Sequence, residues 1–247
     1  MPHVVTSPTK EVKFIVINRD ENFPGAMTLM ALQAPYKSII RFAGGCKGMK
    51  PEDKPQMLEF FRVACAGFRG VAMSGATSSL NSLNEVDPMI TDIPDYLART
   101  NPEIISLGTA PRTACMAFKE NMQLHLDDWG TRPNGGMRCI VLIQDGGENK
   151  LEWNGDLPAY FSFMSSLQKY SGFHPALVVW NGGPVTIEEA LLAKDKGWPI
   201  FVITGTGRAA DNELGPDHFT GANVYHVDKA HPELLNNLLI ANEVISL

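Results

Sequence analysis

Short apolar runs that end in glycine turns constrain this chain most. Residues 176–179 lead into Asn181-Gly182-Gly183-Pro184, and residues 199–203 lead into Thr204-Gly205-Thr206-Gly207. A short apolar run bounded by a turn signal is typical of a strand buried on both faces of a parallel sheet. Because an amphipathic segment follows each turn, the order of elements predicts βα units.

The same alternation extends over the whole chain. We expect strands at residues 12–17, 38–42, 70–73, 103–106, 138–143, 176–179, 199–203 and 223–226, and helices at 54–66, 156–170, 186–196 and 231–246, with a weaker helical pattern at 110–122. This order predicts an α/β fold of the Rossmann-like, doubly wound type, with a mostly parallel sheet and helices on both faces. Residues 1–11 are expected to form a loose N-terminal tail, and residues 12–247 a single domain.

The composition excludes several classes of function. A formal net charge of -6 argues against nonspecific binding to nucleic acid or to an anionic membrane, since such binding needs a basic face. No apolar stretch approaches the roughly 18 residues of a membrane span, and no signal sequence is visible, so we expect a cytoplasmic protein. The four cysteines are far apart and the six histidines lack ligand spacing, which predicts reduced thiols and no metal site.

The first glycine turn lies in the N-terminal half of the chain. Gly44, Gly45 and Lys47 follow an expected strand, so the backbone N–H groups and the lysine can hold a phosphate. The spacing is not that of a Walker loop, because Lys47 precedes the last glycine. A tight βα turn without a ligand is the alternative.

Two further turns also follow expected strands. Ser74, Gly75 and Thr77 offer hydroxyl groups to a phosphate or a ribose, whereas a nucleophile elbow would need glycines where alanines stand. Thr109 and Arg112 lie in the turn that follows the next expected strand, and Arg112 can serve as a counter-charge. Its alternative is a surface arginine at the start of a helix.

The two C-terminal turns carry the clearest signals. Gly182, Gly183 and Thr186 meet at an expected helix start, where glycines admit an anion and the threonine donates a hydroxyl. The motif Gly205-Thr206-Gly207-Arg208-Ala209-Ala210 satisfies Gly-x-Gly-x-x-Ala, with Asp228 at the end of the next strand. A dehydrogenase places this turn on its first strand, whereas here only one strand and one helix follow.

A family resemblance rests on these motifs. Residues 176–211 closely resemble the N-terminal domain of TRPM channels, with its Glu-Gly-Gly-Pro-Gly-Thr and Gly-Ser-Gly-Arg-x-Ala-Asp turns, and are similar to the stand-alone prokaryotic LSDAT branch of the SLOG superfamily. Weaker matches occur at residues 74–77, 107–111 and 143–146. The resemblance implies a Rossmann-like fold that recognises nucleotides derived from NAD or ADP-ribose, with Arg208 in the ligand site. The alternative for Arg208 is an ion pair with Asp211.

The same superfamily contains enzymes. LOG phosphoribohydrolases carry Pro-Gly-Gly-x-Gly-Thr-x-x-Glu, and Glu189 falls on the position of their catalytic glutamate. A carboxylate there can stabilise an oxocarbenium-like ribose or activate water. Asn181 and Val185 depart from the motif, which weakens hydrolysis more than binding. Glu188 and Glu189 are equally explained as first-turn acids that complement the helix dipole.

These observations predict a sensor of an ADP-ribose or NAD-derived nucleotide, with no cofactor required. The ligand-binding residues are expected to be Gly182, Gly183 and Thr186 on the phosphate, then Gly205, Thr206, Gly207 and Arg208, with Gly44, Gly45, Lys47, Ser74, Gly75, Thr77, Thr109 and Arg112 on the opposite wall. A stand-alone sensor must signal by changing its assembly or by docking on a partner, so we expect a homo-oligomer or a separate effector protein. A nucleotide N-glycosidase that uses Glu189 is the alternative.

Overall fold

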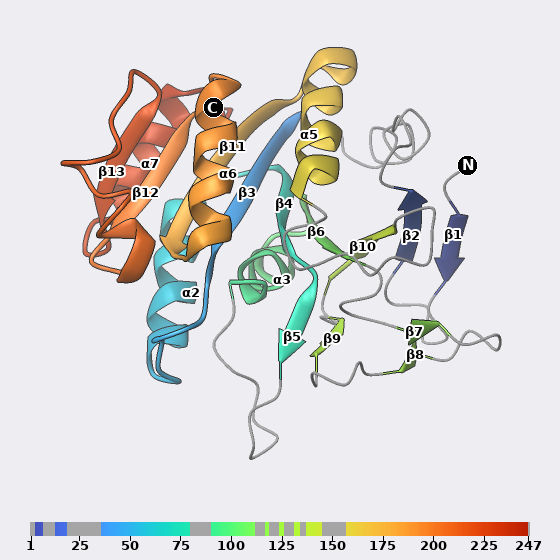
Figure 1. Cartoon of the computed structure of the whole chain (residues 1–247). Helices are drawn as coiled ribbons and strands as arrows, with labels where there is room; N and C mark the ends of the chain where they lie inside the picture. The colour runs from blue at the N-terminus through green and yellow to red at the C-terminus, as the bar shows by residue number, and fades with distance from the viewer. Residues whose placement is uncertain are drawn as a thin grey trace.

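The structure, a computed structural model, describes residues 36–79, 90–111, 137–144 and 157–246, and in addition short strands at residues 3–6, 13–18, 117–118, 124–125 and 131–133. Its main element is a nine-stranded sheet in the order β1-β2-β10-β6-β4-β3-β11-β12-β13 (Figure 1). The strands are β1 (His3–Thr6), β2 (Lys13–Asn18), β3 (Ser38–Gly45), β4 (Gly70–Gly75), β6 (Ile104–Pro111), β10 (Cys139–Gln144), β11 (His174–Asn181), β12 (Ile200–Thr204) and β13 (Val224–Asp228). The helices are α2 (Asp53–Ala64), α3 (Asp92–Thr100), α5 (Leu157–Ser171), α6 (Pro184–Asp195) and α7 (Pro232–Ala241), with the 3-10 turn η1 (Arg208–Ala210). Two small ladders pair β5 (Thr77–Ser79) with β9 (Thr131–Pro133), and β7 (Ala117–Phe118) with β8 (Leu124–His125).

The direction of the strands confirms the predicted α/β class. Every neighbouring pair from β2 to β13 is parallel, and within this sheet only β1 runs antiparallel to its neighbour. The prediction of a loose tail is wrong for His3–Thr6, which pairs with β2. The physical reason is that β2 is otherwise an open edge, and a run containing the β-branched residues Val4 and Val5 suits a strand at that edge.

Helices cover both faces of the sheet, as the doubly wound prediction requires (Figure 1). Side chains alternate across β3, so that Ile39 lies in one apolar cluster and Phe42 in the other. The first cluster includes Phe163 of α5 and Ala190 of α6. The second cluster joins the sheet to α2, α3 and α7, where Phe61 of α2 packs edge-on against Phe42 at 5.2 Å between ring centroids.

One prediction in the middle of the chain is wrong, and one helix was not predicted. Residues 110 and 111, expected to begin a helix, extend β6 instead, and residues 117–118 form a strand. The reason is register: β6 lies between β4 and β10, and its pairing with β10 continues to Pro111. The helix α3 was not predicted at all, because its amphipathic pattern of Ile93 and Leu97 spans only nine residues.

The connections reverse direction at the centre of the sheet. From β3 the chain moves outward on one side through β4, β6 and β10, and then returns to the other side of β3 as β11, followed by β12 and β13. The carboxyl ends of β3 and β11 therefore flank a topological switch point, which is where open α/β sheets bind their ligands. Helix α6 begins at this edge, directly after β11.

Candidate functional site

The turns after β3 and β11 lie side by side at the switch point. Asn181, the last residue of β11, is in register with Gly45, the last residue of β3. The neighbouring Gly44 has a packing reason to be glycine, because a Cβ there would lie 2.1 Å from the carbonyl oxygen of Trp180. The backbones of β3 and β11 are therefore in close contact at their carboxyl ends, and the turns that follow them are neighbours.

Arg208 reaches this region from the turn after β12. A Cβ on Gly183 would lie 2.6 Å from Nη2 of Arg208, and a Cβ on Gly45 would lie 3.2 Å from its Nη1. The guanidinium thus rests on the backbone of Gly183 and extends to Gly45, a position that any larger side chain at Gly183 would obstruct. Among the described residues no carboxylate pairs with it. A half-buried arginine without an acidic partner is available to an anion.

The backbone is strained on both sides of this contact. Asn181 has φ 60° and Arg208 has φ 49°, two of the three non-glycine residues with positive φ in the described part of the chain. A left-handed conformation costs about 1 to 2 kcal/mol for a residue with a Cβ. Strained backbone conformations are frequent at binding sites, where they hold a side chain in a particular direction.

Asp211 closes the turn after β12. Its carboxylate accepts hydrogen bonds from the N–H of Gly205 and the N–H of Gly207, both at 2.6 Å. Asp211 therefore fills the place at this turn that a phosphate would take, and it makes no ion pair with Arg208. The alternative of an Arg208–Asp211 pair is wrong, because the acid is already engaged by the two amides.

Thr206 links the two turns. Its hydroxyl accepts the N–H of Asn181 at 2.8 Å and donates to the carbonyl of Ile203 at 2.6 Å. Because this hydroxyl both accepts and donates a hydrogen bond inside the protein, it ties the turn after β12 to the end of β11. A ligand that contacted the Thr206 hydroxyl, as predicted, would have to compete with these two internal hydrogen bonds.

Asn181 carries a buried polar atom with no partner. The residue is 3 % exposed, and its Oδ1 has no hydrogen-bond partner among the described residues. Its Nδ2 donates over a long 3.5 Å to the carbonyl of Lys47. A buried, unpaired acceptor costs about 1 to 3 kcal/mol, and a donor from a bound molecule would remove that cost.

The first turn of α6 faces the same region. Gly183 precedes Pro184, which suits the first helical position, and no side chain caps the helix. The N–H of Gly183 donates to Thr186 Oγ1 at a long 3.3 Å. This helix start therefore combines loosely held amides with the positive end of the dipole.

Glu189 lies one turn deeper in α6, where it is 3 % exposed. Its Oε1 accepts hydrogen bonds from Arg41 Nε at 2.9 Å, Arg41 Nη2 at 2.7 Å and the Tyr160 hydroxyl at 2.6 Å. The Arg41 guanidinium also stacks 4.3 Å above the Tyr160 ring. The alternative of Glu189 as a first-turn acid that complements the helix dipole is wrong, because Glu189 forms a buried ion pair that joins β3, α5 and α6. Glu188 is exposed.

The remaining predicted residues, on the opposite wall, differ from one another in exposure and in hydrogen bonding. Lys47 is exposed in its turn, and Gly75 lies half-buried at the end of β4. The Ser74 hydroxyl is buried and donates to the carbonyl of Gly75 at 3.0 Å, whereas Thr109 has a buried Oγ1 without a partner among the described residues. The side chains of Thr77 and Arg112 lie outside the described residues.

The sequence did not predict the roles of two residues of the site. Asp211 could have been found from its place four residues after Gly207, since an acid near a glycine turn often accepts the backbone amides. Asn181 had been treated only as a departure from an enzyme motif. Its tolerance of the left-handed conformation was a usable signal.

Two other classes of site were sought in the described part of the chain. It holds no group of three or more His, Cys, Asp or Glu side chains that could bind a metal ion. None of the helices there is long and apolar enough to cross a membrane.

Comparison with known proteins gives structural neighbours only. No family model matches the chain, and no curated protein matches it. The chain is similar to the crystal structure of TM1055, a structural-genomics target, with 14% identity and a TM-score of 0.48 over 84% of this chain and 99% of that chain. It is also similar to the molybdenum cofactor carrier protein of Chlamydomonas reinhardtii, with 16% identity and a TM-score of 0.47 over 83% of this chain and 99% of that one. At these identities the likeness concerns the fold alone.

Proposed function

We propose that this protein is a sensor that binds ADP-ribose or another NAD-derived nucleotide at the switch point between β3 and β11. The observation that carries the proposal is the guanidinium of Arg208, which lies against Gly183 and Gly45 with no acidic partner among the described residues. A planar cation beside partly exposed glycine backbone suits the two phosphates of a dinucleotide, which it can contact with a bidentate fork.

The groups around Arg208 suggest which part of the ligand each of them would contact. The phosphates would lie at the start of α6, where the N–H of Gly183 and the helix dipole add to the charge of Arg208. The unpartnered Oδ1 of Asn181 would accept a hydrogen bond from a ribose hydroxyl. The turn at Gly205 and Gly207 would act indirectly in this arrangement, by holding Arg208 through Asp211.

A thermal-shift series tests the class of ligand. At a concentration 100 times Kd, ADP-ribose should add about 2.7 kcal/mol to the stability of the folded state, which for a chain of this size raises Tm by roughly 5 to 10 °C. NAD should act similarly, and adenosine, which lacks phosphate, should not. Equal shifts with adenosine and ADP-ribose would contradict phosphate recognition.

The alternative is hydrolysis of an N-glycosidic bond by Glu189, and the geometry weighs against it. Glu189 is 3 % exposed and its Oε1 accepts three hydrogen bonds from Arg41 and Tyr160, so little of the carboxylate is available to a substrate. Incubation with AMP, NAD and ADP-ribose should release no more base than a Glu189→Gln control does. Base release that Glu189→Gln abolishes would assign the protein to the hydrolases.

The sensor role also requires an output. We expect nucleotide binding to change the self-association of the protein or its affinity for a separate effector. Sedimentation velocity with and without ADP-ribose measures the first of these outputs. A sedimentation coefficient that is the same in both samples would leave effector docking as the output.

A further inference from the structure

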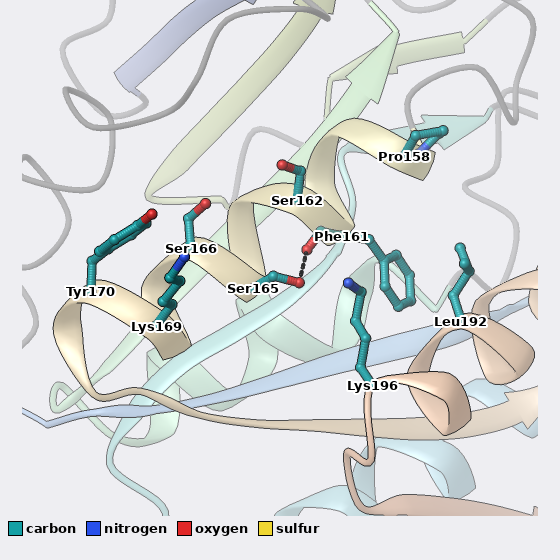
Figure 2. Close-up of a pocket in the computed structure, with 9 residues that line it drawn as sticks. All are labelled: Pro158, Phe161, Ser162, Ser165, Ser166, Lys169, Tyr170, Leu192 and Lys196. Carbon is teal, nitrogen blue, oxygen red and sulfur yellow. Dashed lines mark hydrogen bonds between the residues drawn. The ribbon is translucent and has the colours of Figure 1, made fainter.

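A depression with a volume of about 460 Å³ lies between α5 and α6, on the face of the sheet that these helices cover (Figure 2). We call it the α5–α6 groove; the lining residues used below are Phe161, Ser162, Ser166 and Lys169 of α5, and Leu192 and Lys196 at the far end of α6. Because a helix rises 1.5 Å per residue, Lys196 lies about 18 Å along the helix from Pro184 and the switch point. The groove is therefore separate from the proposed nucleotide site.

The apolar part of the groove is formed by Phe161, Leu192 and Tyr170. Phe161 is 2% exposed, because its ring stacks on the buried Trp198 with 5.3 Å between centroids and an interplanar angle of 12°. Figure 2 shows this phenylalanine between Leu192 and Lys196. Tyr170, at one end of the groove, is 68% exposed, which is the largest exposure of a bulky apolar side chain in the described part of the chain. The exposed ring of Tyr170 can stack on a ligand with a planar apolar body.

The rim of the groove is positive in a protein whose net charge is -6. Lys169 and Lys196 contribute to the lining, which contains no acidic residue. Neither lysine forms an ion pair with a described carboxylate; their Nζ atoms lie 5.0 Å from the Tyr170 ring and 5.7 Å from the Trp198 ring. Aromatic rings beside an ammonium group keep it over the groove without neutralising its charge.

Hydroxyl groups complete the lining. Ser165 is already used, because its Oγ donates to the carbonyl of Phe161 at 2.8 Å. Figure 2 shows Ser165 on the side of α5 that faces Lys196, whereas Ser162 and Ser166 lie on the side away from it. The two lysines are therefore the main polar groups that the groove offers to a ligand. We propose that the α5–α6 groove binds a small organic anion with a flat apolar body, of the class of aromatic carboxylates and sulfonates.

The probe for this site is 1-anilinonaphthalene-8-sulfonate, which combines a planar apolar body with one negative charge and becomes fluorescent when it leaves water. The folded protein should bind it saturably. Naphthalene-2-carboxylate should displace it, and the neutral naphthalene-2-carboxamide should displace it much less. Fluorescence that rises without saturation, or equal displacement by the acid and the amide, would contradict an anion site.

Two independent variants test the location of the probe. Lys169→Glu combined with Lys196→Glu should weaken binding at least about tenfold, the size of a lost charge-assisted contact. Ser165→Trp keeps both charges but fills the groove from the side of α5 that faces Lys196 in Figure 2, and it should weaken binding as well. Lys50→Glu is the matched control, because Lys50 is exposed on another surface.

Melting temperatures show that the variants are folded. Unchanged affinity in both groove variants, or an equal loss in the Lys50→Glu control, would overturn the proposal. ADP-ribose at saturation should not displace the probe from the groove. The outcome is therefore independent of the proposed nucleotide site, and either proposal can fail alone.

Discussion

The turns that follow β11 and β12 are both rich in glycine and threonine, yet they use their backbone amides differently. After β12, the N–H groups of Gly205 and Gly207 are held by Asp211 at 2.6 Å. After β11, the N–H of Gly183 makes only a long 3.3 Å bond to Thr186, and the Arg208 guanidinium lies against the glycine backbone. A glycine motif alone therefore does not identify an anion site; the partners of its N–H groups decide.

The comparison gives each turn a distinct role. The closed turn has its own internal anion and serves as a support for Arg208. The open turn, after β11, has the Arg208 cation beside it but no described acidic group, so it can accept an anionic ligand.

The largest effects are expected from two adjacent glycines. Gly182 has φ 104° and a Cβ there would lie 2.8 Å from Thr186 Cγ2, so Gly182→Ala should lower the free energy of unfolding by about 2 to 3 kcal/mol. Gly183 has an extended backbone that any residue adopts, with φ -160°, and its Cβ would only push the flexible end of Arg208 aside. Gly183→Ala should keep its stability but bind ADP-ribose roughly tenfold more weakly, through partial loss of one charge-assisted contact.

Urea denaturation and calorimetric titration of the two variants measure these quantities. Each variant is the control of the other, because the substitution is the same and the positions are adjacent. A Gly183→Ala protein that is unstable, or one that binds like the wild type, would contradict the assignment of the open turn.

A smaller effect is expected from the closed turn. Asp211→Ala removes two hydrogen bonds to an exposed carboxylate, which should cost about 1 to 2 kcal/mol of stability. If Asp211 also positions Arg208, the loss of nucleotide affinity should disappear when Asp211→Ala is made in an Arg208→Ala background. Asp217→Ala, at another exposed acid, is the control. The same affinity loss in both backgrounds would make the role of Asp211 independent of Arg208.

The smallest effect concerns cysteine reactivity. Cys46 is partly exposed in the turn after β3, so ADP-ribose at the switch point should slow its alkylation by iodoacetamide several-fold. Cys65 is the internal control, because burial raises the pKa of its thiol to about 12 and almost no thiolate exists at pH 8. Peptide mapping by mass spectrometry reads both sites. Labelling of Cys46 that is insensitive to the nucleotide would place the ligand elsewhere.

The sequence was informative wherever local pattern and tertiary structure agree. The apolar runs before Asn181 and Gly205 predicted buried parallel strands, and parallel strands bring their carboxyl ends to one edge. The expected helix at residues 110–122 failed because strand pairing between β6 and β10 overrides local propensity. Likewise, His3–Thr6 pairs with an edge that the sequence does not reveal.

The site was predicted less completely than the fold. The position of Arg208 follows from its motif, but the space it occupies depends on Gly45, which lies far away in the sequence. The pairing of Glu189 with Arg41 spans 148 residues, so no local pattern distinguishes it from a first-turn acid that complements the helix dipole. Hydrogen bonds of this kind depend on which strands become neighbours, and that is a property of the whole sheet.

The central claim is that Arg208 binds the nucleotide and does not merely stabilise the fold. Calorimetric titration of ADP-ribose into the wild type and Arg208→Ala tests it most directly, with Arg208→Gly as a variant that also relieves the backbone strain at φ 49°. Both variants should lose about 1.5 to 3 kcal/mol of binding free energy, Arg208→Lys should recover part of it, and Arg208→Gly should be at least as stable as Arg208→Ala. Arg208→Ala and Arg208→Gly proteins that bind ADP-ribose as tightly as the wild type would contradict the account.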